Sequence, residues 1–315
     1  MKTSKKKITT RESFHNSITW PKKNLEIIIC PLCNSPQYTI LYPHFYPRVV
    51  ICQKCSLVYT NPRLKESYLK ELYTKDYFQN EHSAHYGYED YIADSGKIKK
   101  TFEKRLNDIE KLKKPGNVLD VGCAMGFFMD VCVQHGWQVE GVEISEFAAE
   151  YVKNKLGYRI HTGDFQKVAL PKETYDLITL WDVIEHVPDP VATLKKIYTL
   201  LKPGGMLVLT TPDAGSLPAK LTQHRWIGYK LSDEHLTYFS LKTLRNICEE
   251  AGLSIIRYHQ VGKHVSYAMF TNRVALYNKL IGSALMHAGK VLPKDFSFYI
   301  SAFDIICIYA VKKEK

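Results

Sequence analysis

The sequence contains no apolar run that approaches the length needed to cross a membrane, which is about 18 residues. The longest candidate, residues 303–311, is short and includes Asp304. The N-terminus, Met-Lys-Thr-Ser-Lys-Lys-Lys, is followed by polar residues and lacks the apolar segment of a secretory signal. We therefore expect a cytoplasmic protein with no transmembrane segment.

Strong polarity is also missing. Of the 315 residues, 45% are hydrophobic and 24% are charged, which is ordinary for a globular protein and excludes a largely disordered chain. The net charge of +11 is unevenly spread, because residues 1–24 contain seven Lys or Arg and one Glu and so carry +6 of it. We expect a basic, flexible tail over residues 1–25 and do not expect a nucleic-acid partner.

Half of the eight cysteines fall into pairs, Cys30-Pro-Leu-Cys33 and Cys52-Gln-Lys-Cys55, with eighteen residues between them. This spacing is typical of a zinc ribbon, because each pair turns the chain back and directs two thiolates to one point. Two disulfides and a redox pair are the alternatives. A cytosolic chain argues against disulfides, and the lack of a surrounding βαβ unit argues against a redox pair. We predict a structural zinc ribbon over residues 26–62, with short strands at Ile27–Ile29 and Val49–Ile51.

Further along, strands and helices alternate. A tyrosine-rich connector of undefined role spans residues 63–95, and Phe102, Leu106 and Ile109 lie on one face of a helix predicted over residues 97–113. The next strands are predicted at residues 118–121, 138–142, 158–161, 176–181, 206–210 and 253–258. The helices between them span residues 127–135, 145–156, 191–201 and 241–250, the second capped by Ser145 and the last by Ser240 at their N-termini. This alternation predicts an α/β fold with a parallel, doubly wound sheet over residues 96–260. Residues 261–315 are expected to form a helical segment and a final strand, Ile305–Val311, that returns antiparallel.

The first strand of this region ends in Val-Leu-Asp120-Val-Gly122-Cys-Ala124-Met-Gly126. Gly122 permits a tight turn beside a ligand, and Gly126 permits close packing of helix and strand. Glu143 ends the next strand, 23 residues after Asp120, where an acid accepts hydrogen bonds from a ribose. Together these features predict a nucleoside site. Asp120 would repel a pyrophosphate but suits a ligand that carries an amino group and a sulfonium.

The segment resembles motif I of the class I S-adenosylmethionine-dependent methyltransferases, E/D-x-G-x-G-x-G, with Ala124 in place of the middle glycine. Glu143 and the adjacent Ile144 match the ribose-binding motif II. Gly163-Asp164-Phe165 resembles the adenine-flanking motif III, and residues 175–187 resemble motif IV. The resemblance implies a seven-stranded Rossmann-like methyltransferase sheet. It also implies cofactor-binding residues, which are Asp120, Gly122, Cys123, Gly126, Glu143, Ile144, Asp164, Phe165 and Trp181.

Two further patterns bear on catalysis. Asp182, Glu185 and His186 form D-x-x-E-H after the fourth strand, where ubiquinone-type and small-RNA methyltransferases use E-x-x-E-H to hold Mg²⁺. Magnesium is therefore a possible second metal, and contact of His186 with the cofactor is the alternative. His235 follows Asp233-Glu234 in a loop that covers the substrate side of this fold. We interpret His235 as the general base, supported by Glu234, with a hydrogen-bonded structural role as the alternative.

The flanks, Arg225-Trp226 and Glu234-His235-Leu-Thr-Tyr-Phe-Ser240, resemble methyltransferases of polysaccharide and natural-product biosynthesis clusters. The expected function is O-methylation of a sugar, glycan precursor or small metabolite by S-adenosylmethionine. Sugar C-methylation, RNA 2′-O-methylation and a non-catalytic zinc-ribbon interaction protein are the alternatives.

Overall fold

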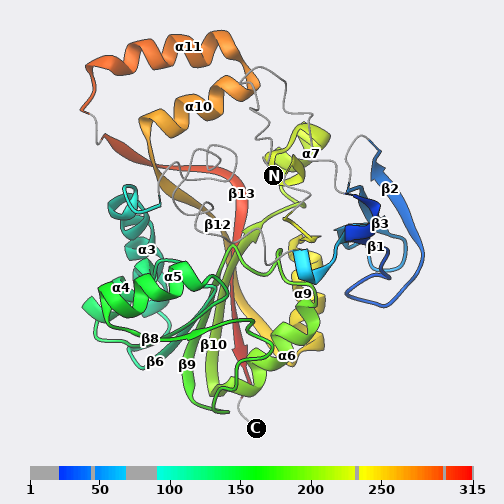
Figure 1. Cartoon of the computed structure of the whole chain (residues 1–315), viewed down its shortest axis with the longest axis vertical. Helices are drawn as coiled ribbons and strands as arrows, with labels where there is room; N and C mark the ends of the chain where they lie inside the picture. The colour runs from blue at the N-terminus through cyan, green and yellow to red at the C-terminus, as the bar shows by residue number, and fades with distance from the viewer. Residues whose placement is uncertain (1–20, 44–46, 69–90, 231–233, 294–295, 314–315) are drawn as a thin grey trace, which may run out of the picture.

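The computed structural model describes residues 21–43, 47–68, 91–230, 234–293 and 296–313 (Figure 1). A seven-stranded sheet lies at its centre. Five strands are parallel: β6 (Asn117–Val121), β7 (Gln138–Glu143), β8 (Arg159–Thr162), β9 (Tyr175–Trp181) and β10 (Leu201–Pro212). With β12 (Leu253–Ser266) and β13 (Ser297–Lys312), the order is β12–β13–β10–β9–β6–β7–β8. β12 has the same direction as these five strands, and only β13, between β10 and β12, runs in the opposite direction. The predicted fold class and the antiparallel return of the last strand are confirmed.

Successive residues of these strands point to opposite faces of the sheet, and both sets are apolar. Helices therefore cover both faces. On β9 and β10, Leu177 and Val208 pack with α3 (Ser95–Glu110) and α4 (Phe127–Gln134). Ile178 and Leu209 pack on the opposite face with α6 (Pro190–Leu200) and α9 (Leu241–Glu250). This two-sided burial leaves the ends of the strands as the place where a ligand can be bound.

Two predicted helix caps have different outcomes. Ser240 caps α9 as expected, because its hydroxyl accepts from the Thr243 amide and the Thr243 hydroxyl accepts from the Ser240 amide. Ser145 stands at the predicted N-cap position of α5 (Glu146–Tyr151), but its side chain forms no capping bond. Its hydroxyl has no hydrogen-bond partner in the described part of the chain, and its amide donates to Glu143 Oε1 at 2.8 Å. The carboxylate of Glu143 thus takes over the start of α5 (Glu146–Tyr151), which continues as η3 (Val152–Leu156).

The C-terminal strands are longer than the sequence predicts. Residue 260, where the sequence places a boundary, lies inside β12. Ile305 of β13 pairs with Val261 of β12 on one side and with Pro212 of β10 on the other. Past this point β10 ends, and β12 and β13 continue alone as a two-stranded ribbon to Ser266 and Ser297. This ribbon carries the helices at the top of Figure 1, which are α10 (Tyr267–Tyr277), α11 (Lys279–Ala288) and the short η5 (Gly289–Val291).

The N-terminal module begins with η1 (Lys22–Asn24) and contains two small sheets. One pairs β1 (Leu25–Glu26) with β5 (Arg63–Leu64). The other has the order β11–β4–β3–β2 and comprises β2 (Tyr38–Tyr42), β3 (Val49–Cys52), β4 (Val58–Thr60) and β11 (Thr237–Tyr238). The strand predicted at Val49–Ile51 is confirmed. The one at Ile27–Ile29 is wrong, because the backbone of Ile28 bonds the side-chain amide of Asn61 instead of a neighbouring strand.

The remaining elements connect β10 to β11, and they are α7 (Leu217–Thr222), η4 (Gln223–Arg225) and α8 (Ile227–Lys230). Among the helices of the described residues, none is both long and apolar enough to span a bilayer. The predicted tail, apart from residues 21–25, and Tyr73, Tyr77, Tyr86 and Tyr88 of the connector lie outside the described residues.

The position of β13 inside the sheet predicts a large contribution to stability. Ile308 is fully buried between Leu209 and Tyr258 of the flanking strands. Ile308→Ala should lower the free energy of unfolding by about 2–5 kcal/mol. Ile256→Ala on β12, where the side chain is 54% exposed, should cost less than about 1 kcal/mol. Urea denaturation of both variants provides the measurement, and equal losses would contradict this placement of β13.

Candidate functional site

A cavity of about 750 Å³ lies where the parallel strands end. Its wall includes Val121 at the end of β6, Gly122 directly after it, Glu143 at the end of β7, and Asp182 directly after β9. In doubly wound sheets the carboxyl ends of neighbouring parallel strands form a common crevice, which is the usual position of a ligand. The cavity therefore occupies the position that the topology favours.

The turn after β6 is shaped by its glycines. Gly122 has φ 71°, and a Cβ atom there would lie 2.7 Å from Val183. Gly126 has φ 72° at the start of α4, where a Cβ atom would lie 2.9 Å from Val152. Side chains at either position would therefore strain the backbone and collide with a neighbour. Ala124 also has a positive φ, 48°, and completes a narrow turn along the cavity wall.

Glu143 ties this turn to the next one. Its Oε2 accepts from the Ala124 amide and its Oε1 from the Ser145 amide, both at 2.8 Å. The side chain is buried, and burial raises the pKa of the carboxyl group, opposed by these amides. The Glu143 carbonyl accepts from Gly163 at 2.7 Å, which joins the third turn to the same strand end. One residue therefore organises three loops around the cavity.

The residues that the methyltransferase resemblance assigns to the cofactor divide into two groups. Six of them line the cavity: Gly122, Glu143, Ile144, Asp164, Phe165 and Trp181. The other three, Asp120, Cys123 and Gly126, lie outside its wall. Asp120 is 1% exposed, accepts a 2.6 Å bond from Thr179 Oγ1, and has its pKa raised to about 7 by burial. The geometry gives Asp120 a role in joining β6 to β9.

A second cluster faces the same cavity. Ligand atoms of Glu185, His186 and His235 all lie within 4.8 Å of one another. The two imidazole rings are 4.8 Å apart and nearly perpendicular. Both oxygens of Glu185, which is 1% exposed, lack a hydrogen-bond partner among the residues described. An orphaned, buried carboxylate beside two imidazoles indicates a site that is completed by a ligand.

Backbone carbonyls fix the tautomers of both rings. His186 Nδ1 donates to the Glu234 carbonyl and His235 Nδ1 to the Gly228 carbonyl, each at 3.1 Å. Each ring therefore presents the lone pair of Nε2. Burial lowers the pKa of His186 to about 4 and the pKa of His235 well below its usual range, so both rings are neutral at pH 7. Burial, followed by the charge of Asp182, raises the pKa of Glu185 well above its usual range.

The sequence grouped Asp182 with Glu185 and His186, whereas the cluster of ligand atoms within 4.8 Å contains His235. Asp182 Oδ1 accepts from Thr210 Oγ1 at 2.7 Å, and the third member of the cluster is His235. Asp182 has φ 55°, a turn of the backbone after β9 that the D-x-x-E-H pattern does not reveal. Asp233, which precedes Glu234, lies outside the described residues. Glu234 contacts the histidine cluster through its backbone carbonyl, which accepts from His186 Nδ1.

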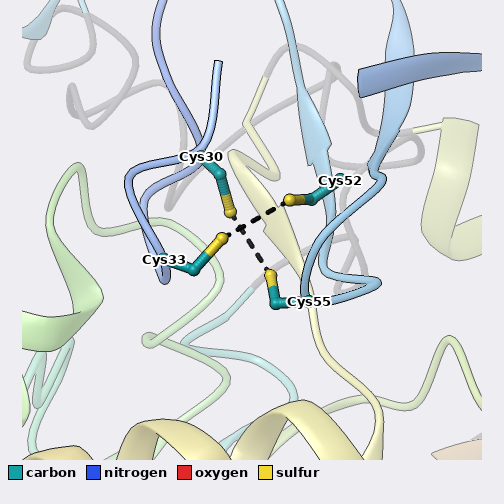
Figure 2. Close-up of side chains that lie close together, drawn as sticks. All are labelled: Cys30, Cys33, Cys52 and Cys55. Carbon is teal, nitrogen blue, oxygen red and sulfur yellow. Dashed lines mark hydrogen bonds between the residues drawn. The ribbon is translucent and has the colours of Figure 1, made fainter. Parts of the chain in front are cut away.

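The four paired cysteines converge on one point (Figure 2). Cys30 and Cys55, and likewise Cys33 and Cys52, have Sγ atoms 3.5 Å apart. A zinc tetrathiolate with bonds of about 2.3 Å has sulfur–sulfur edges of roughly 3.8 Å, so the arrangement fits zinc closely. Burial raises the pKa of Cys30 and Cys55. At Cys52 burial acts in the same direction, but hydrogen bonds from the Cys55 and Lys54 amides and from the neighbouring cysteine side chains together lower the pKa to about 7.

The two cysteine pairs are built alike. The Asn34 amide donates to the Cys30 carbonyl, and the Ser56 amide donates to the Cys52 carbonyl. Asn34 and Ser56 have positive φ angles of 56° and 64°. This repetition supports the predicted zinc ribbon, because each pair forms the same reverse turn around a shared centre.

The cysteine module holds the loop that carries His235. β4 pairs with β11, the Thr60 amide donates to the Leu236 carbonyl at 3.0 Å, and Thr60 Oγ1 donates to the His235 carbonyl at 2.8 Å. Arg63 Nη1 donates to the Pro188 carbonyl at 2.7 Å, two residues beyond His186. The module therefore contacts the chain beside both histidines. Thr60 and Arg63 could not be identified from the sequence, because neither belongs to a motif.

The sheet order, with one antiparallel strand, and the glycine turn with Glu143 define a class I S-adenosylmethionine-dependent methyltransferase. The chain belongs to the methyltransferase domain family, whose model matches residues 95–258.

Two relatives are ubiquinone biosynthesis O-methyltransferases. The one from Coxiella burnetii is 35% identical over 114 residues, which are 34% of this chain and 49% of the relative. The one from Nitrosospira multiformis is 34% identical over 102 residues, which are 30% of this chain and 42% of the relative. The chain thus spans about half the length of these relatives.

A solved structure of a candidate methyltransferase from Bacillus halodurans C-125 shares the fold. It superposes with a TM-score of 0.50 and 19% identity, covering 67% of this chain and 98% of the other. At this identity the likeness concerns the fold alone.

Loss of the thiolate centre should loosen the His235 loop. Cys52→Ser should remove one bound zinc per chain, and amides 237 and 238 should then exchange with solvent at least about tenfold faster, because β11 loses its ordered partner β4 and the bond from the Thr237 amide to the Glu185 carbonyl opens with it. Amides of β6 should stay protected. Lys54→Ser, an exposed position in the same turn, is the matched control. Hydrogen exchange with metal analysis tests this, and unchanged protection at 237 and 238 after zinc loss would contradict it.

Proposed function

We propose that this enzyme transfers the methyl group of S-adenosylmethionine to a hydroxyl oxygen of a sugar, glycan precursor or other small metabolite. The observation that carries the proposal is the shared cavity. The turn organised by Glu143 lines one part of it, and Glu185, His186 and His235 line another. The names of the two relatives above, which are O-methyltransferases, also support an oxygen acceptor. Action in the cytoplasm stays a prediction from the sequence.

The reaction requires positioning more than covalent chemistry. The bond from the methyl carbon to sulfur breaks as the bond to oxygen forms, and the hydroxyl proton leaves, giving S-adenosylhomocysteine and a methyl ether. We assign Gly122, Glu143, Ile144, Asp164, Phe165 and Trp181 to cofactor binding. The indole of Trp181 packs on Phe128 at 4.9 Å and on the Arg105 guanidinium at 5.0 Å, so its position in the wall is fixed.

The acceptor hydroxyl is assigned to the histidine cluster. With Nδ1 committed to the Gly228 carbonyl, His235 Nε2 is the atom that can take the hydroxyl proton. Its low pKa makes the free imidazole a weak base. The alternative is a bound cation, because one carboxylate and two neutral imidazoles fit a divalent transition-metal ion better than Mg²⁺, which prefers oxygen ligands. Such an ion, held by Glu185, His186 and His235, would lower the pKa of the acceptor hydroxyl, and His235 would then be a ligand and not the base.

Cofactor binding provides one test. Glu143→Ala should weaken S-adenosylhomocysteine binding by about 1–3 kcal/mol, because it removes the ribose acceptor and the bonds that hold the turn at Ala124. Glu146→Ala, at an exposed position in the first turn of α5, should bind as wild type does. Titration calorimetry measures both. A wild-type chain that bound NAD but not S-adenosylhomocysteine would refute the proposal.

The cluster provides a second test. If it holds a cation, the chain should bind two metal ions, one lost in Cys52→Ser and the other in Glu185→Gln and His235→Ala. Methyl transfer should then stop with a chelator and return with a divalent metal. If His235 acts as base without a metal, wild type should keep its activity in a chelator treatment that leaves the zinc bound by metal analysis, whereas His235→Ala should lose about 10²–10⁴-fold. Full activity of His235→Ala in chelator would contradict both roles.

A further inference from the structure

The segment that contains α10 and α11 carries no negative charge in its sequence. Residues 251–294 include six Lys or Arg and no Asp or Glu. Most of this segment lies beyond the family match, which ends at residue 258. Figure 1 shows α11 at the outer end of the molecule, with α10 between it and the sheet. A partner that approaches α11 from outside therefore meets a helix without acidic side chains.

The inner face of α11 is already occupied by α10. Gly282 is buried, and a Cβ atom there would lie 2.4 Å from Ala275. A Cβ atom at Gly289, where η5 continues α11, would lie 2.2 Å from the ring of Tyr267. The Tyr267 hydroxyl also donates to the Leu285 carbonyl at 3.0 Å. These close contacts fix which side of α11 faces outward.

The outer face of α11 is apolar and exposed. At about 100° per residue, one stripe opposite Gly282 is formed by Leu280, Ala284, Ala288 and Val291, with Ile281 beside it. Leu280 is 84% exposed and Val291 is 88% exposed. Apolar side chains that gather on a projecting helix without being buried indicate an interaction surface.

Two lysines border this stripe. Lys279 and Lys290 are eleven residues apart, about three helical turns, and so lie on the same edge of it. Both are exposed, and within the described ranges no acidic side chain pairs with either. Lys279 stands in the first turn of α11, where the helix dipole disfavours a cation. The cap is Asn278, whose side chain accepts from two amides at 3.1 Å, so helix stability does not account for Lys279.

We propose that the outer face of α11 docks on a bilayer that contains anionic lipids, with the apolar stripe in the interface and Lys279 and Lys290 at the lipid phosphates. An apolar stripe bordered by lysines is typical of helices that lie in the plane of a membrane surface. Each lysine near an anionic surface strengthens such binding. A second copy of the chain suits this face less, because a two-fold contact of α11 with α11 would bring lysines and no acid to both sides.

The docking face adjoins the cavity. α10, which lies behind α11, contributes Met269 and Phe270 to the cavity wall. A bilayer on α11 would therefore lie beside the part of the wall that is most distant from the family match. The inference goes beyond the proposed methyl transfer and does not rest on it.

Vesicle binding tests the docking face. The full chain is sedimented with vesicles of phosphatidylcholine alone and with vesicles of phosphatidylcholine and phosphatidylglycerol in equal amounts. Binding to the anionic vesicles should be at least about tenfold tighter, and added salt should reduce this preference because it screens the lysines. Equal binding to both kinds of vesicle, or binding to neither, would overturn the proposal.

Paired variants connect the binding to α11. Leu280→Ser combined with Val291→Ser should weaken binding to the anionic vesicles at least about tenfold, because the stripe no longer enters the interface. Lys279→Gln combined with Lys290→Gln should reduce the preference for phosphatidylglycerol at least about tenfold.

Matched controls come from other exposed positions. Ile256→Ser on β12 and Lys242→Gln on α9 should bind vesicles as wild type does. Every variant should also bind S-adenosylhomocysteine as wild type does, because none of the changed residues lines the cavity. This readout reports an intact fold. A wild-type chain that docks on vesicles but does not bind S-adenosylhomocysteine would keep the docking face and lose the proposed function.

Two further outcomes would assign the surface differently. A preference for phosphatidylglycerol that survives both lysine changes would place the docking elsewhere, for instance on the basic residues 1–24, and would overturn the role of α11. Vesicle binding that is unchanged by the two serine changes, together with a shift from dimer to monomer in sedimentation equilibrium, would make this face a contact between two copies of the chain.

Discussion

The parallel alignment of β9, β6 and β7 is the constraint on which the site depends. Hydrogen bonding between these strands brings the ends of all three to one edge of the sheet, so Gly122, Glu143 and Asp182 meet although 60 residues separate the first from the last. Glu143 then fixes the turns by accepting two backbone amides with one carboxylate. A buried carboxylate is costly unless its oxygens are bonded, and here those bonds also shape the cavity.

A second constraint comes from the other end of the chain. The cysteine module has its own set of four sulfur ligands, yet it shares a sheet with β11, and Thr60 donates a hydrogen bond to the backbone of His235. Four sulfur ligands leave no open position for catalysis, so the effect of the module on chemistry must be mechanical. It holds the loop of one histidine and, through Arg63, the turn after the other.

Much of this arrangement follows from sequence patterns. The alternation of strands and helices, the glycine turn, Glu143 and the cysteine spacing are local signals, and each predicted its element. The failures have physical reasons. Ser145 stands at the N-cap position, but its hydroxyl makes no capping bond, and the Glu143 carboxylate accepts from its amide. Asp182 has a positive φ and accepts from Thr210, and the cluster around Glu185 and His186 contains His235. The grouping of Glu185 and His186 with His235 depends on long-range contacts that no single segment encodes.

The most direct measurement of the central claim follows the methyl group itself. The protein is incubated with S-adenosylmethionine labelled with ¹³C at the methyl carbon and with panels of sugars, phosphorylated sugars and hydroxy acids, and products are observed by carbon NMR. We expect an enzyme-dependent signal among methoxy carbons that is lost in His235→Ala. A signal among carbon-bound methyl groups, or a methoxy signal that His235→Ala retains in full, would contradict it.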